Sequence, residues 1–136
     1  MSAPIEVVRA FLAGLSKTHD EMAATFRHYF TPDSYWENVG MMTTRGAEES
    51  IALMDQLEER TGVNGLTVEL LAIAADGDTV LTERVDRLLR ADGSEIAAYR
   101  VTGVFEVANG RILAWRDYFD TAGAANTTLT DQMQSA

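Results

Sequence analysis

The sequence has no cysteine, two prolines and a single lysine, Lys17, among its 136 residues. The absence of cysteine excludes disulfide bonds, thiol nucleophiles and cysteine-ligated zinc, and it is typical of a cytoplasmic protein. No apolar run is long enough to span a membrane, and the first residues lack the basic segment with which a secretory signal begins. We therefore expect a cytoplasmic protein with no membrane contact.

Positive charge is also scarce, with 11 basic residues against 21 acidic residues and a net charge of −10. A field of that sign repels the phosphate backbone, so nucleic acid is not an expected partner. At 46% hydrophobic residues the chain lies well above the composition of disordered proteins. The length fits one domain over residues 1–136, and a neutral small molecule is compatible with the charge.

The chain divides into a helical first third and a strand-rich remainder. Apolar residues recur at helical spacing over residues 5–15, a capping box at residues 18–21 starts a second helix, and a third is expected over about residues 47–60. Strands are predicted over residues 34–39, 66–75, 79–90, 95–108 and 111–119. Asp-Gly or Asn-Gly turns separate the last four and favour antiparallel hairpins. We expect an α+β fold with helices on one face of a sheet, and a loose tail over about residues 121–136.

Side chains of a strand alternate between two faces, and one carboxylate, Asp117, stands out in this alternation. Two sets of alternate residues are mostly apolar: Leu113, Trp115, Asp117 and Phe119; and Ala97, Tyr99, Val101, Gly103, Phe105 and Val107. Both faces of the strand over residues 79–90 mix charged with bulky apolar residues, and one of them carries Val80, Thr82, Arg84, Asp86 and Leu88. If these faces line one concavity, Asp117, Asp86 and Arg84 all point into it. An arginine between two carboxylates offsets much of the cost of burying them.

Such a trio permits two interpretations. It can be a structural ion pair that holds the sheet together. It can also be an acid and base pair, since two carboxylates in unlike environments can differ in protonation, one giving and one taking a proton. That chemistry suits the addition of water to a strained, neutral electrophile.

Two segments of the chain resemble the limonene-1,2-epoxide hydrolase family. They are LTERVDRL at residues 81–88 and GVFEVANGRILAWRDYFD at residues 103–120; ENVG at residues 37–40 and Arg45–Gly46 are also similar. The resemblance implies a cone-shaped α+β fold of the nuclear-transport-factor-2-like or SnoaL-like type. Its strongly curved, mixed or antiparallel sheet carries the N-terminal helices on the concave face and encloses a pocket. It also implies a homodimer.

The resemblance assigns roles to the trio by motif position. Arg84 corresponds to the bridging arginine, Asp86 to the acid that protonates the epoxide oxygen, and Asp117 to the base that activates water. The implied reaction converts a hydrophobic cyclic epoxide into a vicinal diol in one step. It requires no metal, no organic cofactor and no covalent intermediate.

The family holds its water with an asparagine and a tyrosine two residues apart on one strand. The asparagine corresponds to Asn38, but the tyrosine position falls on Trp36, which is a departure. Tyr35 is adjacent and is expected to face the other way. The indole N–H of Trp36 is a donor and can replace the tyrosine as a contact for water. The expected substrate wall is Leu88, Tyr99, Val101 and Phe119.

Two other functions are compatible with the fold that the resemblance implies. A ketosteroid-isomerase-like or cyclase-like enzyme would need a base near a carbonyl carbon and a neutral donor at its oxygen, which Tyr35 or Tyr99 could supply. A non-catalytic module that binds a small ligand would need no acid and base pair. An arginine shared by two carboxylates is more typical of water activation than of isomerisation. The joint presence of Arg84, Asp86, Asp117 and Asn38 argues against the binding module, while the replaced tyrosine keeps it open.

Overall fold

The computed structural model describes residues 2–124, which form an α+β fold. In chain order the elements are α1 (Pro4–Leu15), α2 (His19–Tyr29), β1 (Phe30–Asn38), β2 (Met42–Arg45), α3 (Gly46–Thr61), β3 (Gly65–Asp76), β4 (Thr79–Leu89), β5 (Glu95–Ala108), β6 (Arg111–Tyr118) and α4 (Thr121–Ala124). The helical first third and the strand-rich remainder agree with the sequence prediction. None of the helices within the described residues is long and apolar enough to cross a membrane.

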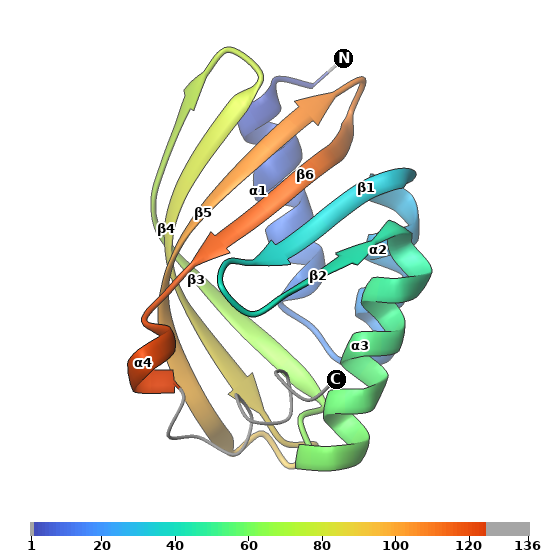
Figure 1. The fold of residues 1–136 in the computed structure, drawn as a ribbon, viewed down its shortest axis with the longest axis vertical. Coiled ribbons are helices and arrows are strands. Elements are labelled where there is room, and N and C mark those ends of the chain that lie inside the picture. The colour runs from blue at the N-terminus through green and yellow to red at the C-terminus, as the bar shows by residue number, and fades with distance from the viewer. Residues whose placement is uncertain (1, 125–136) are drawn as a thin grey trace.

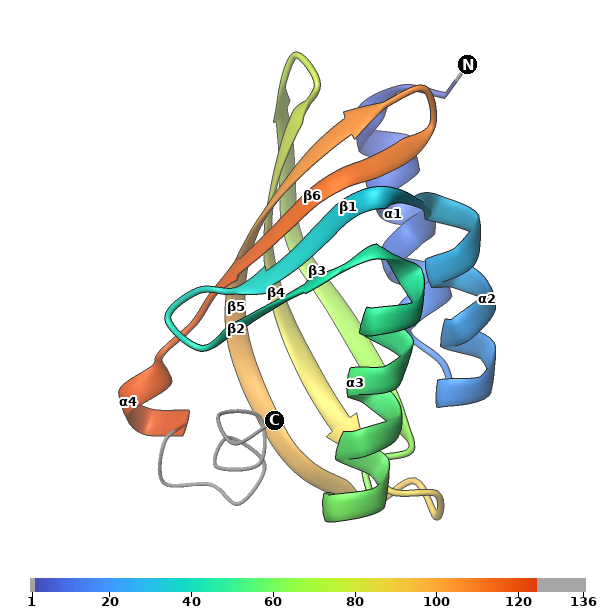
Figure 2. The ribbon, with the colours of Figure 1, turned by 45° about the vertical axis from the view of Figure 1, so that its right-hand side comes forward.

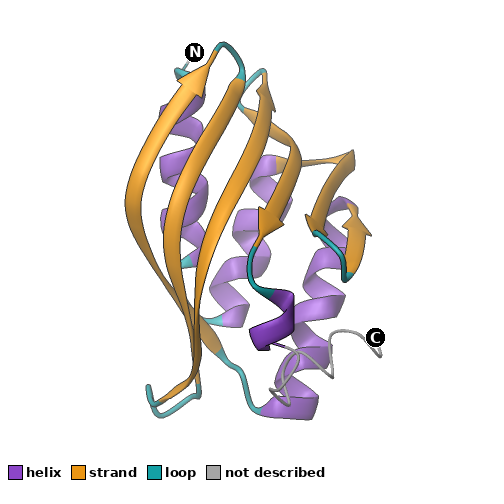
Figure 3. Cartoon of the chain, turned by 60° about the vertical axis from the view of Figure 1, so that its left-hand side comes forward, coloured by secondary structure: helices purple, strands orange, loops and turns teal. Residues whose placement is uncertain are grey.

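The strands of residues 2–124 form one curved sheet in the order β2-β1-β6-β5-β4-β3. β3 to β6 make an antiparallel meander, whereas β1 pairs in parallel with β6 and antiparallel with β2, so the sheet is mixed. Figures 1 and 2 show α1, α2 and α3 together on the concave side of this sheet. Figure 3 shows the strands from the opposite side, in front of these helices.

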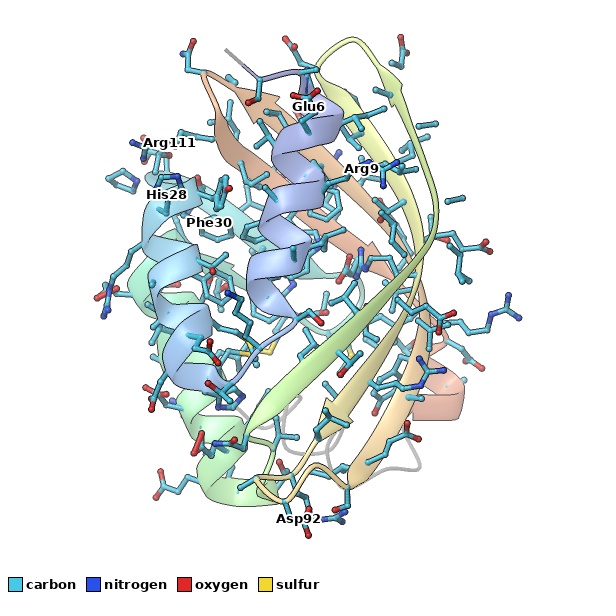
Figure 4. The ribbon with its side chains drawn as sticks, turned by 180° about the vertical axis from the view of Figure 1, so that it is seen from behind. Glu6, Arg9, His28, Phe30, Asp92 and Arg111 are labelled. Atoms are coloured by element: carbon cyan, nitrogen blue, oxygen red, sulfur yellow. The ribbon has the colours of Figure 1, made fainter. Side chains whose placement is uncertain are left out.

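The helices cover the sheet because each has one apolar face. In α1 the buried face includes Val8, Phe11 and Leu15, while Glu6 and Arg9 are exposed on the other face (Figure 4). The ring of Phe11 lies within 6.2 Å of rings from α2, β1, β5 and β6, measured between centroids. Two rings of this aromatic core, Phe26 and Trp115, also line the pocket between the helices and the sheet.

The ends of the helices follow the local sequence. Thr18 and Glu21 form the predicted capping box at the start of α2. α3 ends at Thr61 and is followed by Gly62, whose φ of +81° is accessible mainly to glycine. Two features were missed: the first strand already begins at Phe30, and the short strand β2 pairs with it. The predicted tail contains α4 at its start, and its remainder lies outside the described residues.

A β-bulge in β6 corrects one predicted position. Leu113 was expected to face the concavity together with Trp115, but its side chain is 40% exposed and Ile112 is buried instead. The pairing between β5 and β6 shifts register here, because Val107 is opposite Ile112 while Glu106 is opposite Ala114. The extra residue in β6 shifts the alternation of side chains by one position, so that Ile112 faces inward before the bulge and Trp115 faces inward after it.

Candidate active site

The site is assembled by one row of residues that runs across four neighbouring strands. Thr82 of β4 is opposite Gly103 of β5, and Gly103 is opposite Asp117 of β6. The parallel pairing of β1 with β6 then places Asn38 beside Asp117. Directly opposite residues point to the same face of a sheet, so the row brings these positions together on the concave face.

Arg84 lies two residues along β4 from this row and is completely buried. Its Nε donates to Oδ1 of Asp86 at 3.2 Å, and its Nη2 donates to Oδ2 of Asp86 at 2.9 Å. The same Nη2 donates to Oδ2 of Asp117 at 2.8 Å, while Nη1 donates to the hydroxyl of Thr82 at 3.1 Å. Burial by itself lowers the pKa of Arg84, but the two carboxylates outweigh it and hold the pKa above its ordinary value. The guanidinium is therefore a permanent cation between two carboxylates.

Asp117 is buried between two donors. Its Oδ2 accepts from Arg84, and its Oδ1 accepts from the indole Nε1 of Trp115 at 2.7 Å. Burial raises the pKa of the Asp117 carboxyl above its ordinary value, while the charge of Arg84 and both hydrogen bonds act in the opposite direction. An elevated pKa makes the carboxylate a stronger base. Asp117 thus has the environment of a proton acceptor.

Two further donors lie close to this carboxylate along β1. The rings of Trp36 and Trp115 stack with centroids 4.7 Å apart and planes 8° from parallel. The indole Nε1 of Trp36 and the amide Nδ2 of Asn38 are both buried and have no hydrogen-bond partner among residues 2–124. A buried polar group without a partner is costly unless water or a ligand satisfies it. Trp36 and Asn38 both line the pocket whose wall includes Asp117. A water molecule or a polar group of a ligand bound there could accept hydrogen bonds from these two donors.

The pocket itself is a largely apolar cavity of about 90 Å³ between the helices and the sheet. It is lined by Leu15, Met22, Phe26, Trp36, Asn38, Met54, Leu57, Val63, Leu66, Asp86, Leu88, Tyr99, Val101, Trp115, Asp117 and Phe119. The carboxylates of Asp86 and Asp117 are the charged groups of this wall. An apolar guest in this cavity would therefore have two carboxylates beside it.

The structure brings the predicted site residues together. Arg84 lies behind the pocket wall, where it binds both carboxylates. The wall itself contains Asp86, Asp117, Asn38, Trp36 and the four predicted substrate contacts, Leu88, Tyr99, Val101 and Phe119. Tyr35 faces away, because its hydroxyl accepts from Arg116 at 2.7 Å and its ring lies beside Arg45. Within residues 2–124, no group of three or more His, Asp or Glu side chains is arranged to hold a metal ion.

Sequence reasoning missed three contributors to the site. Trp115 was interpreted as an apolar residue, although a buried indole N–H generally needs an acceptor. Thr82 and Gly103 were placed on the inward faces without a role. The signal for Gly103 was available, since a glycine within a strand often marks a close approach of another group.

Known proteins share sequence and fold with this chain. The family model described as the limonene-1,2-epoxide hydrolase catalytic domain matches residues 2–129. Epoxide hydrolase EphG of Mycobacterium tuberculosis is 43% identical over 88 residues, which span 65% of this chain and 56% of that relative. The structure of an LEH-like epoxide hydrolase from M. tuberculosis is 35% identical and superposes with a TM-score of 0.71, covering 96% of this chain and 88% of the other.

More distant structures share the fold alone. An NTF2-like protein of unknown function from Burkholderia pseudomallei covers 100% of both chains with a TM-score of 0.73 at 20% identity. The same fold is thus found without the sequence similarity of the hydrolases. From the family match over nearly the whole chain, this protein belongs to the limonene-1,2-epoxide hydrolase catalytic domain family.

Proposed function

We propose that this protein adds water to a hydrophobic epoxide and releases a vicinal diol. The observation that carries the proposal is the single guanidinium of Arg84 between the carboxylates of Asp86 and Asp117, at the wall of an apolar pocket. One cation between two anions leaves one negative charge in excess. A single proton on the pair neutralises the cluster, and this arrangement provides one acid and one base together.

Asp117 is assigned as the base because the unpartnered donors lie on its side of Arg84. A water held there accepts from the indole N–H of Trp36 and donates to Asp117 and to the side-chain amide oxygen of Asn38. The amide can present either its oxygen or its nitrogen to the pocket by rotating about its last torsion. One lone pair of the water remains free to attack an epoxide carbon.

Asp86 is assigned as the acid. It lies on the other side of Arg84 and lines the pocket with a side chain that is 15% exposed. As the water oxygen bonds to carbon, the carbon–oxygen bond of the ring breaks, and the ring oxygen takes the proton of Asp86. Asp117 takes a proton from the water at the same time. One proton has then moved from Asp86 to Asp117, and its return restores the enzyme.

The substrate is proposed to be a neutral, apolar and compact epoxide. The lining residues away from the carboxylates are aliphatic or aromatic, and they offer no cation for a substrate anion. A cyclic alkene oxide or a monoterpene epoxide has this chemistry. Replacement of the family's tyrosine by Trp36 places a larger ring beside the water site, so Trp36→Tyr is expected to change rate or substrate preference.

Diol formation on a panel that includes limonene 1,2-epoxide and cyclohexene oxide tests the proposal. We expect the wild-type protein to form diol, and Asp117→Asn and Asp86→Asn each to reduce kcat by about a hundredfold or more. Asp55→Asn, on the exposed surface of α3, is the matched control and should retain full activity. Diol formation by both site variants at the wild-type rate would refute the assigned roles. A wild-type protein inactive on every epoxide would refute the proposed function.

A further inference from the structure

We propose that Thr82 and Gly103 form a positioning site for the guanidinium of Arg84, called here the Arg84 seat, which fixes how Arg84 is shared between the two carboxylates. The inference rests on the proposed function for its kinetic consequences. The geometry of the seat is independent of any substrate. Neither residue touches the pocket, so their role is to position Arg84.

Thr82 fixes the rotation of the guanidinium plane. An arginine side chain has donors only, so the 3.1 Å contact between Nη1 and Thr82 Oγ1 requires the hydroxyl oxygen to accept. The hydroxyl hydrogen then points to the backbone oxygen of Gly103 at 3.3 Å. Thr82 is thus itself oriented by the neighbouring strand. Nε and Nη2 donate to Asp86, and Nη1 donates to Thr82, so all three nitrogens of the guanidinium group are held.

Gly103 provides the space through which Arg84 reaches Asp117. It lies between Thr82 and Asp117 in the row that crosses β4, β5 and β6. A Cβ atom at this position would lie 2.3 Å from Nη1 of Arg84, 2.7 Å from Oδ1 of Asp117 and 3.0 Å from Oγ1 of Thr82. These atoms belong to buried groups held by hydrogen bonds, so they cannot all move aside. Any larger residue here therefore separates the arginine from the base.

The Arg84 seat has an electrostatic role in addition to packing, because it holds the positive charge of Arg84 next to the Asp117 carboxylate. The cation of Arg84 opposes the effect of burial on Asp117, so a guanidinium that turns away leaves the Asp117 carboxylate less stabilised. Loss of the Arg84 seat then changes the pKa of Asp117. It also changes the distance over which the proton returns from Asp117 to Asp86. A merely structural pair of residues would change the stability of the protein without changing either quantity.

Thr82→Val removes the hydroxyl and keeps the shape, and Thr82→Ser keeps the hydroxyl. Thr102→Val, the same substitution on the exposed face of β5, is the matched control. The first measurement is a ¹³C NMR titration of the Asp117 carboxyl. The second is kcat and KM on an epoxide that the wild type hydrolyses. We expect Thr82→Val to raise the pKa of Asp117 and to lower kcat by about tenfold or more with little change in KM. Thr82→Ser and Thr102→Val should behave as the wild type.

The titration decides the inference even if no epoxide is hydrolysed, so failure of the proposed function is distinguishable from failure of the seat. Circular dichroism establishes that each variant is folded. Should Thr82→Val fail to fold, Gly103→Ala, which forces a methyl group between Arg84 and Asp117, is titrated in its place and should show the same upward shift. An unchanged Asp117 titration in the folded variant would overturn the proposal. So would a Thr82→Ser variant as impaired as Thr82→Val.

Discussion

At the level of single side chains, the site is defined by an imbalance of charge. Arg84 binds two carboxylates, and burial raises the pKa of Asp117, the more deeply buried of them. Burial of two anions with one cation costs stability that an apolar core would not cost. Proton transfer between the two carboxylates would explain why this cost is retained.

The pH dependence of kcat/KM should reveal the pKa of Asp117, the proposed base. Asp117 acts when ionised, so kcat/KM should fall on the acid side as the pH drops through the pKa of Asp117. Because burial raises that pKa, the midpoint should lie above the ordinary aspartate value of 3.8. Rates measured between about pH 4 and pH 9 would show it. A profile that stays flat to the lower limit, in a protein that is still folded there, would contradict the assignment.

Asp117→Asn should separate stability from activity. A carboxyl whose pKa is raised by folding contributes stability at low pH and loses it as the pH rises through the folded value. Asparagine does not titrate and leaves Arg84 paired with Asp86. We therefore expect the inactive variant to gain unfolding free energy relative to the wild type as the pH rises, as measured by urea denaturation at about pH 5 and pH 8. A variant that loses relative stability at the higher pH would indicate a structural ion pair instead.

At the level of elements, the pocket depends on how α2 and α3 meet at the start of β3. His19 at the beginning of α2 is buried, and its Nδ1 lies 2.7 Å from Oε1 of Glu58 in α3. The backbone N–H of His19 donates to the carbonyl oxygen of Asn64, just before β3. These contacts hold three elements together behind the pocket wall.

Glu58→Ala tests this junction. Without the carboxylate, Nδ1 of the buried His19 loses its partner, and we expect the free energy of unfolding to fall by about 1–2 kcal/mol. Glu59→Ala, an exposed neighbour on the same helix, is the control and should cost much less. Denaturant titrations of the three proteins give the comparison. Equal losses for the two variants would show that the interaction between His19 and Glu58 is not what stabilises the junction.

The sequence predicts most elements because their signals are local. Capping residues, turn dipeptides and alternating strands identify α2, the four-strand meander and the inward faces that carry Arg84, Asp86 and Asp117. The exceptions depend on distant pairing. The bulge at Leu113 is a property of the register between β5 and β6. The parallel pairing that sets Asn38 beside Asp117 joins β1 with β6, which are far apart in the chain, and no local pattern specifies it.

At the level of the whole molecule, the face of the sheet away from the helices carries exposed apolar side chains. Leu81 is 47% exposed and Tyr118 is 45% exposed. Each is next in the chain to a residue that faces inward, Thr82 or Asp117, so alternation along the strand places it on the outer face. Exposed apolar side chains on one face of a sheet are compatible with an interface to a second copy. The homodimer implied by the resemblance is therefore proposed to form through this face.

Sedimentation equilibrium tests the proposed dimer. We expect twice the mass of the chain for the wild type and a shift to the monomer for Leu81→Glu, because a charge in an apolar interface is costly. Leu71→Glu, also at an exposed leucine, shows whether the effect is specific to the position. A wild-type protein that is monomeric throughout the concentration range would contradict the proposal.

The origin of the oxygen atom that enters the diol is the most direct test of the central claim, that a water activated by Asp117 attacks the epoxide. A single turnover is run in ¹⁸O-labelled water with enzyme in excess over an epoxide that the protein hydrolyses. We expect one labelled oxygen in the diol from this first turnover, and none of the label in the carboxyl of Asp117. An unlabelled diol from the first turnover would mean that a carboxylate of the protein, and not water, attacked the epoxide.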